Sequence, residues 1–347
     1  MTWIEAFYIS PTQTNLYFHT KKAIEPYTVY WTYDNNNMTK HKTKIISSNK
    51  KILPLTVVSP SSRRIYFIVV FKSGQTLLCG HRILPVKGLY NLRDMGGYVT
   101  NTHKRLKWGL CYRSDYFYYL SDESMEYMQN VSMQTIIDLR SEAEIETKPN
   151  RLFGNQKTYI CDPAAITARQ AGKIQHWQDA KEDMLAYASK EVSKGKTGIE
   201  NMEKQQRQFV TNAVSKKAFS DMMKIICQKE TPPFVIHCRG GKDRTGYGAM
   251  LFAGILGVSQ EDLVYDYLLT AMARKQKNKV YYKHFIEQTE DVRVADYMYS
   301  LFDTRESYIL ASMQQILQQY ASIREYAMAE LGITKEEIET MESLYLE

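Results

Sequence analysis

The sequence predicts a mixed α/β protein, with a central, mostly parallel sheet flanked by helices and a smaller all-β unit before it. Three observations carry this prediction. Short apolar runs separated by turn residues fill residues 24–84. Helix-like and strand-like patterns alternate after residue 86. An apolar strand ending at His237 is joined by a glycine-containing turn to an apolar helix that starts near Thr245.

The chain has 347 residues, of which 44% are hydrophobic, and we favour two domains, residues 1–85 and residues 86–347. Residues 1–85 are predicted to form a β-sandwich of the immunoglobulin-like or fibronectin-like type. The predicted strands cover residues 28–33, 44–47, 55–58, 65–71 and 76–84, with turns at 34–37, 59–62 and 73–74. The junction is expected at residues 85–88.

Residues 86–347 are predicted to form the α/β unit. Ser121 is expected to cap a helix, followed by buried strands at 135–139 and 157–160. The stretch 163–230 is long, charged and mostly helical, and it exceeds what a connection between two strands requires. We interpret it as an insertion, either a helical pair packed on the sheet edge, which we favour, or a mobile lid.

The last third of the chain is predicted to be helical. Residues 247–256 form an apolar helix, and Ser259 begins the next one. Apolar residues then repeat at the spacing of one helix whose stripe faces the core, at positions 309, 313, 316, 320, 323 and 327. Gly332 ends that helix, and Thr334 begins the last.

The turn at residues 237–246 reads His-Cys-Arg-Gly-Gly-Lys-Asp-Arg-Thr-Gly. Its backbone N–H groups can converge on one anion, and the helix N-terminus adds positive potential, which is typical of a phosphate-binding loop. Cys238 would lie beneath the phosphorus, where the same field favours the nucleophilic thiolate. Arg244 supplies a planar fork for two phosphoryl oxygens. None of the other four cysteines has an arginine six residues later, so the signal is specific.

The loop resembles the signature of cysteine-dependent phosphatases, and its Gly-Lys-Asp-Arg-Thr-Gly half is similar to the bacterial tyrosine phosphatases that also act on phosphoinositides. Residues 91–98, 136–141 and 320–332 resemble that family in the same order. The resemblance covers about residues 86–347. It implies a cysteine-phosphatase fold and hydrolysis of phosphotyrosine, of phosphoinositides or of both, with no metal or cofactor.

We expect hydrolysis in two steps, in which a phosphocysteine forms on Cys238 and water releases phosphate. Gly240 and Gly241 contribute backbone to the phosphate cradle. Thr245 either donates a hydrogen bond to the sulfur or caps the helix. His237 is expected to brace the loop.

A general acid must protonate the leaving oxygen, because an alkoxide is a poor leaving group. Three aspartates compete. Asp243 lies within the loop, where certain lipid phosphatases keep their acid, and it ranks first. Asp138 ends a strand, and Asp162 follows another, where tyrosine phosphatases often carry the acid. For Asp138 and for Asp162, a structural role in a salt bridge or a turn is an equal alternative to the role of general acid.

Arg239 and Lys242 add two cations to the loop, a pattern similar to phosphoinositide 3-phosphatases, whose loops carry basic residues at these two places. The extra charge suits a polyphosphorylated headgroup. An equal alternative is that it raises the local potential for any phosphate. Arg239 also departs from the bacterial family, where a small or apolar residue is expected.

The formal net charge of +7 is concentrated near the N-terminus. Residues 1–85 carry 11 Lys and Arg against 3 Asp and Glu, whereas residues 86–347 carry 34 against 35. This basic excess is consistent with a solvated basic face and with peripheral contact with an anionic membrane, and both interpretations stay open. Nucleic acid is not expected as a partner, because the aromatic residues near the N-terminus also suit strand cores.

Neither a signal-like start nor about 18 successive apolar residues is present, so we expect a cytoplasmic location, with secretion of a mature form left open. Five irregularly spaced cysteines predict neither a disulfide framework nor a metal site.

Two other classes of protein stay open. A binding module would capture phosphorylated ligands without turnover, which the intact set of Cys238, Arg244 and Thr245 disfavours. Another anion-loop cysteine enzyme, an arsenate reductase or a sulfurtransferase, is the second alternative. Arsenate reduction would need a nearby resolving cysteine, and none lies within ten residues of Cys238.

Overall fold

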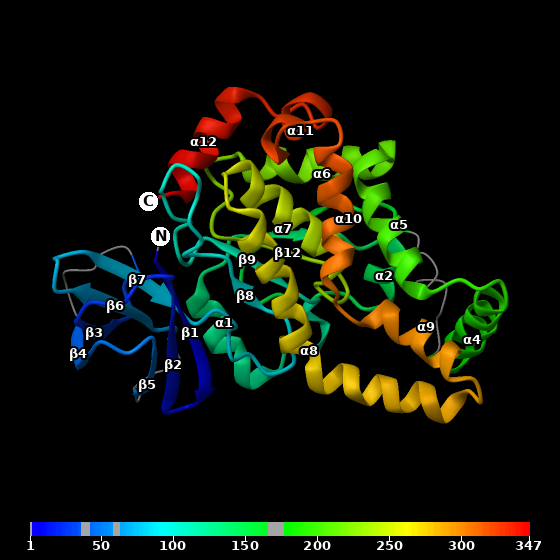
Figure 1. The fold of residues 1–347 in the computed structure, drawn as a ribbon, viewed down its shortest axis with the longest axis horizontal. Coiled ribbons are helices and arrows are strands. Elements are labelled where there is room, and N and C mark those ends of the chain that lie inside the picture. The colour runs from blue at the N-terminus through cyan, green and yellow to red at the C-terminus, as the bar shows by residue number, and fades with distance from the viewer. Residues whose placement is uncertain (1, 36–41, 58–62, 166–176) are drawn as a thin grey trace.

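The computed structural model describes residues 2–35, 42–57, 63–165 and 177–347, which form a mixed α/β protein, as predicted. Figure 1 shows the N-terminal strands on one side and a sheet covered by helices on the other. Parts of the predicted turns, residues 36–37 and 59–62, lie outside the described residues. The same holds for residue 58, at the end of a predicted strand, and for residues 166–176 of the predicted insertion.

The N-terminal strands form two antiparallel sheets with the orders β1-β2-β5 and β4-β3-β6-β7. The strands are β1 (Trp3–Ser10), β2 (Gln13–His19), β3 (Tyr27–Thr32), β4 (Thr43–Ser48), β5 (Ile52–Thr56), β6 (Tyr66–Phe71) and β7 (Thr76–Gly80). Side chains from both sheets share one core, with Leu16, Phe67 and Ile68 fully buried. The β1–β2 hairpin was not predicted.

The last predicted strand of this region, residues 76–84, is too long, because β7 ends at Gly80. There the chain leaves its partner β6 and crosses to the other sheet, where the backbone N–H of Arg82 donates to the carbonyl of Ala6 (2.8 Å). The prediction at residues 55–58 was displaced, since β5 covers Ile52–Thr56.

The remaining strands form one sheet of the order β11-β10-β12-β9-β8. They are β8 (Arg93–Asp94), β9 (Cys111–Ser114), β10 (Thr135–Asp138), β11 (Lys157–Ile160) and β12 (Phe234–His237). All neighbours are parallel except β8 and β9. The register pairs Asp138 with His237, and His237 with Ser114, so the carboxyl ends of three strands meet at one edge. Open α/β sheets bind ligands at that edge.

Alternate residues of these strands face opposite layers. Ile137 and Ile236 join the main core, whereas Ile136 and Val235 pack on the other face.

The helices are α1 (Met125–Val131), α2 (Glu142–Thr147), α4 (Trp177–Ser193), α5 (Gly198–Thr211), α6 (Ala213–Ile226), α7 (Asp243–Ile255), α8 (Gln260–Gln288), α9 (Val292–Phe302), α10 (Glu306–Leu317), α11 (Ile323–Glu330) and α12 (Lys335–Tyr345). Two short 3-10 helices cover Phe117–Tyr119 and Asp122–Ser124.

The apolar stripe from residue 309 to residue 327 was predicted to lie on one helix, and this is wrong, because the chain forms α10 and α11 instead. A new helix, α11, begins after Ser322, because the Ser322 hydroxyl accepts a hydrogen bond from the backbone N–H of Glu325 (3.1 Å) and caps this helix. Ile309, Ile316 and Ala327 are nevertheless fully buried.

The helices of the stretch 163–230 differ in what they cover. Phe219 and Met222 of α6, like Phe209 of α5, are buried in the main core beneath the sheet. Helix α4 packs instead with α9 and the far end of α8, around a small cluster that includes Ala188 and Phe285. Figure 1 shows this group projecting from the side opposite the N-terminal strands.

The N-terminal sheets and the α/β unit are joined through buried charge and aromatic rings. The Arg82 guanidinium lies 5.7, 4.3 and 4.5 Å from the ring centroids of Trp3, Tyr98 and Trp108 and donates to the Glu5 carboxylate (2.7 Å). Trp108 follows the junction in sequence but packs into the core of the N-terminal sheets. Side chains of the two parts therefore pack against each other in one buried interface.

Candidate active site

The turn between β12 and α7 begins at Cys238, at the carboxyl edge of the sheet. Gly241 has a φ of +63°, and a Cβ at this position would lie 2.4 Å from the carbonyl oxygen of Ser114, so the turn requires glycine. Helix α7 begins at Asp243, which places Arg244 in its first turn. A strand, a tight turn and a helix N-terminus are the elements of an anion-binding loop.

The carbonyl groups of this loop are held by side chains from elsewhere in the chain. The Asn91 side-chain amide donates to the carbonyls of Gly240 (3.1 Å) and Gly241 (2.8 Å). Arg274 donates to Gly240 (2.9 Å), and Arg113 donates to Gly241 (3.0 Å). Because the C=O and N–H of a trans peptide point in opposite directions, these contacts turn the N–H groups of the same peptides away from the donors. The loop can then present them to a ligand.

A buried carboxylate fixes two of the side chains behind the loop. Asp266 of α8 accepts hydrogen bonds from Arg93 (3.1 Å) and from Arg113. Burial alone would raise the pKa of Asp266, but the charges of these two arginines outweigh it and hold the pKa well below the ordinary value. Asn91 is placed in turn by its own backbone N–H, which donates to Asp115 (3.0 Å).

Arg244 is held by Glu144, which was not predicted as a site residue. The two guanidinium nitrogens of Arg244 donate to the two carboxylate oxygens of Glu144 (2.7 and 2.9 Å), and one also donates to the carbonyl of Leu139 (2.9 Å). Burial opposes ionisation of Glu144, yet the Arg244 contact lowers its pKa. Burial likewise disfavours the cation of Arg244, but the charges of Cys238 and Glu144 raise its pKa.

A local sequence signal could have located Glu144. Ser141 caps α2 and forms a capping box with Glu144, in which the Ser141 hydroxyl accepts from the Glu144 backbone (3.4 Å) and the Ser141 backbone donates to the Glu144 carboxylate (3.0 Å). The pattern Ser-x-x-Glu directly after the strand β10 therefore aims this carboxylate at the same edge of the sheet as the loop.

The three candidate aspartates have different surroundings. Asp243 is 16% exposed; it accepts from the Tyr267 hydroxyl (3.1 Å), and the Lys242 ammonium lies 3.5 Å away. Asp138 is buried and accepts from the Arg140 guanidinium (2.7 Å) and the Asn150 amide (3.2 Å). Burial would raise the pKa of Asp138, but the neighbouring His237 and Arg140 lower it. Asp162 is partly exposed and accepts from the backbone N–H of Ala164 (2.8 Å).

Arg239 and Lys242, the two additional cations of the loop, have different surroundings. Arg239 is exposed, and among the described residues it forms no ion pair. Lys242 is buried, and its ammonium donates to the carbonyls of Leu301 (2.8 Å) and Asp303 (2.6 Å) at the end of α9. Burial lowers the pKa of Lys242. Lys242 thus ties the loop to α9.

His237 and Thr245 flank the loop and are fully buried. One ring nitrogen of His237 lies 3.2 Å from the carbonyl oxygen of Cys238, and the other lies 3.0 Å from the Asn150 amide. Burial lowers the pKa of His237. The Thr245 hydroxyl has no hydrogen-bond partner in the described part of the chain.

The four other cysteines are buried and unpaired. Burial raises the pKa of Cys161 and Cys227 to about 12, which leaves them poor thiolates. Within residues 2–35, 42–57, 63–165 and 177–347 there is no group of three or more His, Cys, Asp or Glu side chains arranged to hold a metal ion. No helix in these ranges has the length and apolar character that crossing a membrane requires.

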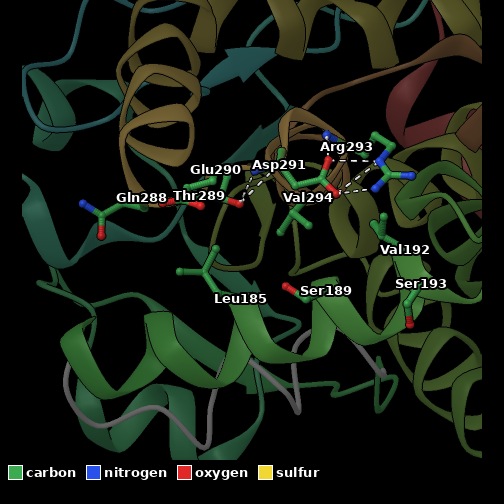
Figure 2. Close-up of a pocket in the computed structure, with 10 residues that line it drawn as sticks. All are labelled: Leu185, Ser189, Val192, Ser193, Gln288, Thr289, Glu290, Asp291, Arg293 and Val294. Atoms are coloured by element: carbon green, nitrogen blue, oxygen red, sulfur yellow. Dashed lines mark hydrogen bonds and ion pairs between the residues drawn. The ribbon is translucent and has the colours of Figure 1, made fainter.

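A separate pocket lies between α4 and the turn that joins α8 to α9 (Figure 2). Leu185, Val192 and Val294 form its apolar wall, and the ion pair of Asp291 with Arg293 (2.6 Å) lies at its rim. None of the candidate catalytic residues lines this pocket.

Comparison with known proteins identifies the family of this chain. Residues 84–347 match the tyrosine phosphatase family, and this chain belongs to it. A protein of Cupriavidus necator, provisionally named a tyrosine-protein phosphatase, is 25% identical over 248 residues, which are 71% of this chain and 83% of that protein. The triple specificity protein phosphatase PtpB of Mycobacterium tuberculosis is 23% identical over 285 residues, which are 76% of this chain and 99% of that protein.

A weak likeness to a solved structure was also found. The pectate lyase Pel3 of Pectobacterium carotovorum aligns with a TM-score of 0.18 and 15% identity over 25% of this chain and 30% of that one. A TM-score this low carries no argument about the fold. The family match supports a phosphatase acting on phosphorylated substrates.

Proposed function

We propose that this protein hydrolyses phosphomonoesters with Cys238 as the nucleophile. One observation carries the proposal: the turn that begins at Cys238 leads directly into α7, whose first turn carries Arg244, and both oxygens of Glu144 hold the Arg244 guanidinium (2.7 and 2.9 Å). A guanidinium fixed in this way is preorganised to bind phosphoryl oxygens and the charge that develops on them in the transition state.

In the first step, the Cys238 thiolate attacks phosphorus, the S–P bond forms, and the bond from phosphorus to the leaving oxygen breaks while an aspartic acid protonates that oxygen. In the second step, water attacks the phosphocysteine, its proton passes to the same aspartate, and the S–P bond breaks to give the thiolate and inorganic phosphate. The Thr245 hydroxyl is available to donate to the departing sulfur.

We assign the general acid to Asp243. It lies in the first turn of α7, it is partly exposed, and the Tyr267 hydroxyl orients its carboxyl group. Asp162 is the alternative, because its charge acts on Arg244. We assign Asp138 a structural role, because its carboxylate is buried and committed to Arg140 and Asn150.

For the substrate we propose phosphotyrosine, with phosphoinositides as a second class. The name of the Mycobacterium tuberculosis relative, a triple specificity phosphatase, supports a broad substrate range. The exposed Arg239 supports contact with additional negative charge, whereas Lys242 is committed to the end of α9 and is assigned to hold the loop.

We further propose that residues 86–347 adopt the cysteine-phosphatase arrangement, and that residues 1–85 form an accessory β-sandwich without catalytic residues. The match from residue 84 onward supports this division. The basic excess of residues 1–85 supports peripheral contact with an anionic membrane surface.

A phosphate-release assay tests the function. The full chain should hydrolyse p-nitrophenyl phosphate and a phosphotyrosyl peptide, and Cys238→Ser should reduce both rates to that of the blank. Cys227→Ser is the matched control: it changes a buried cysteine at the end of α6, and its activity should stay near that of the wild type. Turnover that survives Cys238→Ser would refute the assignment.

A further inference from the structure

Three cations without carboxylate partners surround the outer side of the candidate loop. Arg239 belongs to the loop, and Arg274 and Lys277 lie one turn apart on α8. In the described part of the chain, none of the three has an Asp or Glu oxygen within ion-pair distance. Most of the buried arginines of this molecule are different: Arg82, Arg93, Arg113, Arg140 and Arg244 each hold a carboxylate.

Arg274 is the most unusual of the three. It is 8% exposed, it gives one hydrogen bond to the loop carbonyl of Gly240 (2.9 Å), and its buried Nε has no partner among the described residues. A buried guanidinium with an unused donor is costly unless an anion completes it. Its place beside the loop indicates that this anion belongs to a ligand.

Lys277 extends the same surface. Its ammonium lies 4.6 Å from the ring centroid of Tyr90. Asp115, whose charge acts on Lys277, already accepts the backbone N–H groups of Tyr90 (3.2 Å) and Asn91 (3.0 Å). Burial, followed by the charges of Arg274 and Arg239, lowers the pKa of Lys277. An anion bound there would relieve this repulsion.

We propose that Arg239, Arg274 and Lys277 form a second anion subsite beside the loop, and that it binds an acidic side chain next to the phosphotyrosine of a peptide substrate. This inference rests on the proposed function of Cys238. Arg239 and Lys277 are the specificity-determining residues. Arg274 positions the loop through Gly240 and adds charge to the subsite.

The aromatic side chains around the subsite favour a peptide over an inositol headgroup. Cys238 is 3% exposed, whereas Tyr90, whose ring contacts Lys277, and Tyr119 are each 47% exposed. Arg239 and Lys277 act electrostatically on Tyr116 and Tyr119, respectively. A flat phenyl ring can stack between such rings while it carries the phosphate inward, whereas a hydroxylated inositol ring would need polar partners there.

Two phosphotyrosyl peptides that differ at one position test the proposal, with Asp or Asn directly before the phosphotyrosine. The wild-type kcat/KM should be about fivefold higher for the Asp peptide at low ionic strength, because the exposed Arg239 and the partly exposed Lys277 contribute modestly, and salt should reduce the ratio. The ratio should fall towards one in Lys277→Ala and in Arg239→Ala. It should persist in Lys275→Ala/Lys279→Ala, which removes two exposed charges from the same helix.

Binding of both peptides to the Cys238→Ser variant, followed by fluorescence anisotropy, gives a readout that does not depend on turnover. The subsite predicts tighter binding of the Asp peptide even if the wild type proves inactive, so a failure of the catalytic proposal remains distinguishable. Equal binding of both peptides would overturn the inference. So would a preference that Lys277→Ala and Arg239→Ala leave intact. A Lys277-dependent preference for inositol bisphosphate over monophosphate, without any for the Asp peptide, would assign the subsite to a second phosphate and overturn the peptide inference.

Discussion

The candidate aspartates differ in the number of donors that hold each carboxyl group. Arg140 and Asn150 bind Asp138 inside the protein, and they stabilise its ionised form. A general acid must instead be protonated when the substrate is bound and must be within reach of the leaving oxygen. Asp243, beside the loop and in contact with a hydroxyl, satisfies the second requirement better than Asp138 does.

Replacing Asp243 by Asn should lower kcat by about 100-fold or more for a substrate with a poor leaving group, because general acid catalysis contributes about 10²- to 10⁴-fold. The loss should be smaller for p-nitrophenyl phosphate, whose leaving group needs less help. The pH profile of kcat should lose its basic limb, which reports loss of the acidic proton. Asp138→Asn is the comparison and should keep this limb. If Asp162→Asn removes the limb and Asp243→Asn keeps it, the acid is Asp162.

At the scale of elements, the loop depends on side chains delivered by other strands and helices. Asn91 comes from the segment before β8, Arg113 comes from β9, and Arg274 comes from α8. Each of them binds a loop carbonyl. The loop conformation is therefore a property of the surrounding elements as much as of its own glycines.

Asn91→Ala removes the donor shared by the carbonyls of Gly240 and Gly241 and leaves one donor on each. We expect kcat to fall about 10-fold or more, since the loop amides lose their fixed direction. We also expect the free energy of unfolding to fall by about 1–3 kcal/mol. Steady-state kinetics and urea denaturation measure the two effects. The control is Asn130→Ala, which removes a side chain that donates to a carbonyl of its own helix (3.0 Å). Unchanged kcat in Asn91→Ala would contradict this role.

At the scale of the whole molecule, the N-terminal sheets and the α/β unit are held together by groups that cannot be separated without exposing charge. Glu5 of β1 accepts from Arg82 and from Tyr265 of α8. Burial disfavours the Glu5 carboxylate, but the charge of Arg82 together with the contacts of His19 and Tyr265 outweighs burial and lowers the pKa of Glu5. We therefore expect the two units to unfold together.

His81 gives this joint stability a pH dependence. It is buried among the N-terminal strands, where it contacts the Thr14 hydroxyl (2.9 Å), and burial lowers its pKa from 6.5 to about 3. Below pH 6.5 the unfolded chain binds a proton at His81 that the folded chain does not. The free energy of unfolding should therefore fall by up to about 1.4 kcal/mol per pH unit between pH 6.5 and 3. Buried His237 acts in the same direction.

Urea denaturation of His81→Gln between pH 6.5 and 5 measures the contribution of His81. This variant keeps a polar partner for Thr14 but does not titrate, so its stability should fall less steeply as the pH is lowered. The control is His103→Asn, which removes an exposed histidine and suits the left-handed backbone there. Equal slopes for the wild type and His81→Gln would mean that His81 contributes nothing.

Much of the fold followed from local patterns. The strand, turn and helix around Cys238 were predicted closely, as were the starts of α8 at Ser259 and of α12 at Thr334, because caps and glycines act within one turn of the chain. The β1–β2 hairpin was missed. Its strands bury residues such as Glu5 and Thr14, whose polar side chains hide the alternation of a strand.

Local patterns in the sequence are enough to predict the reactive groups that we propose: a cysteine and an arginine six positions apart, separated by glycines, between an apolar strand and an apolar helix. These are short-range relations along the chain. The side chains that surround them come from distant parts of the chain. Glu144 reaches Arg244 across 100 residues, and Asn91 reaches the loop across 149 and 150 residues. Such contacts depend on strand register and helix packing, which no local spacing of residues encodes.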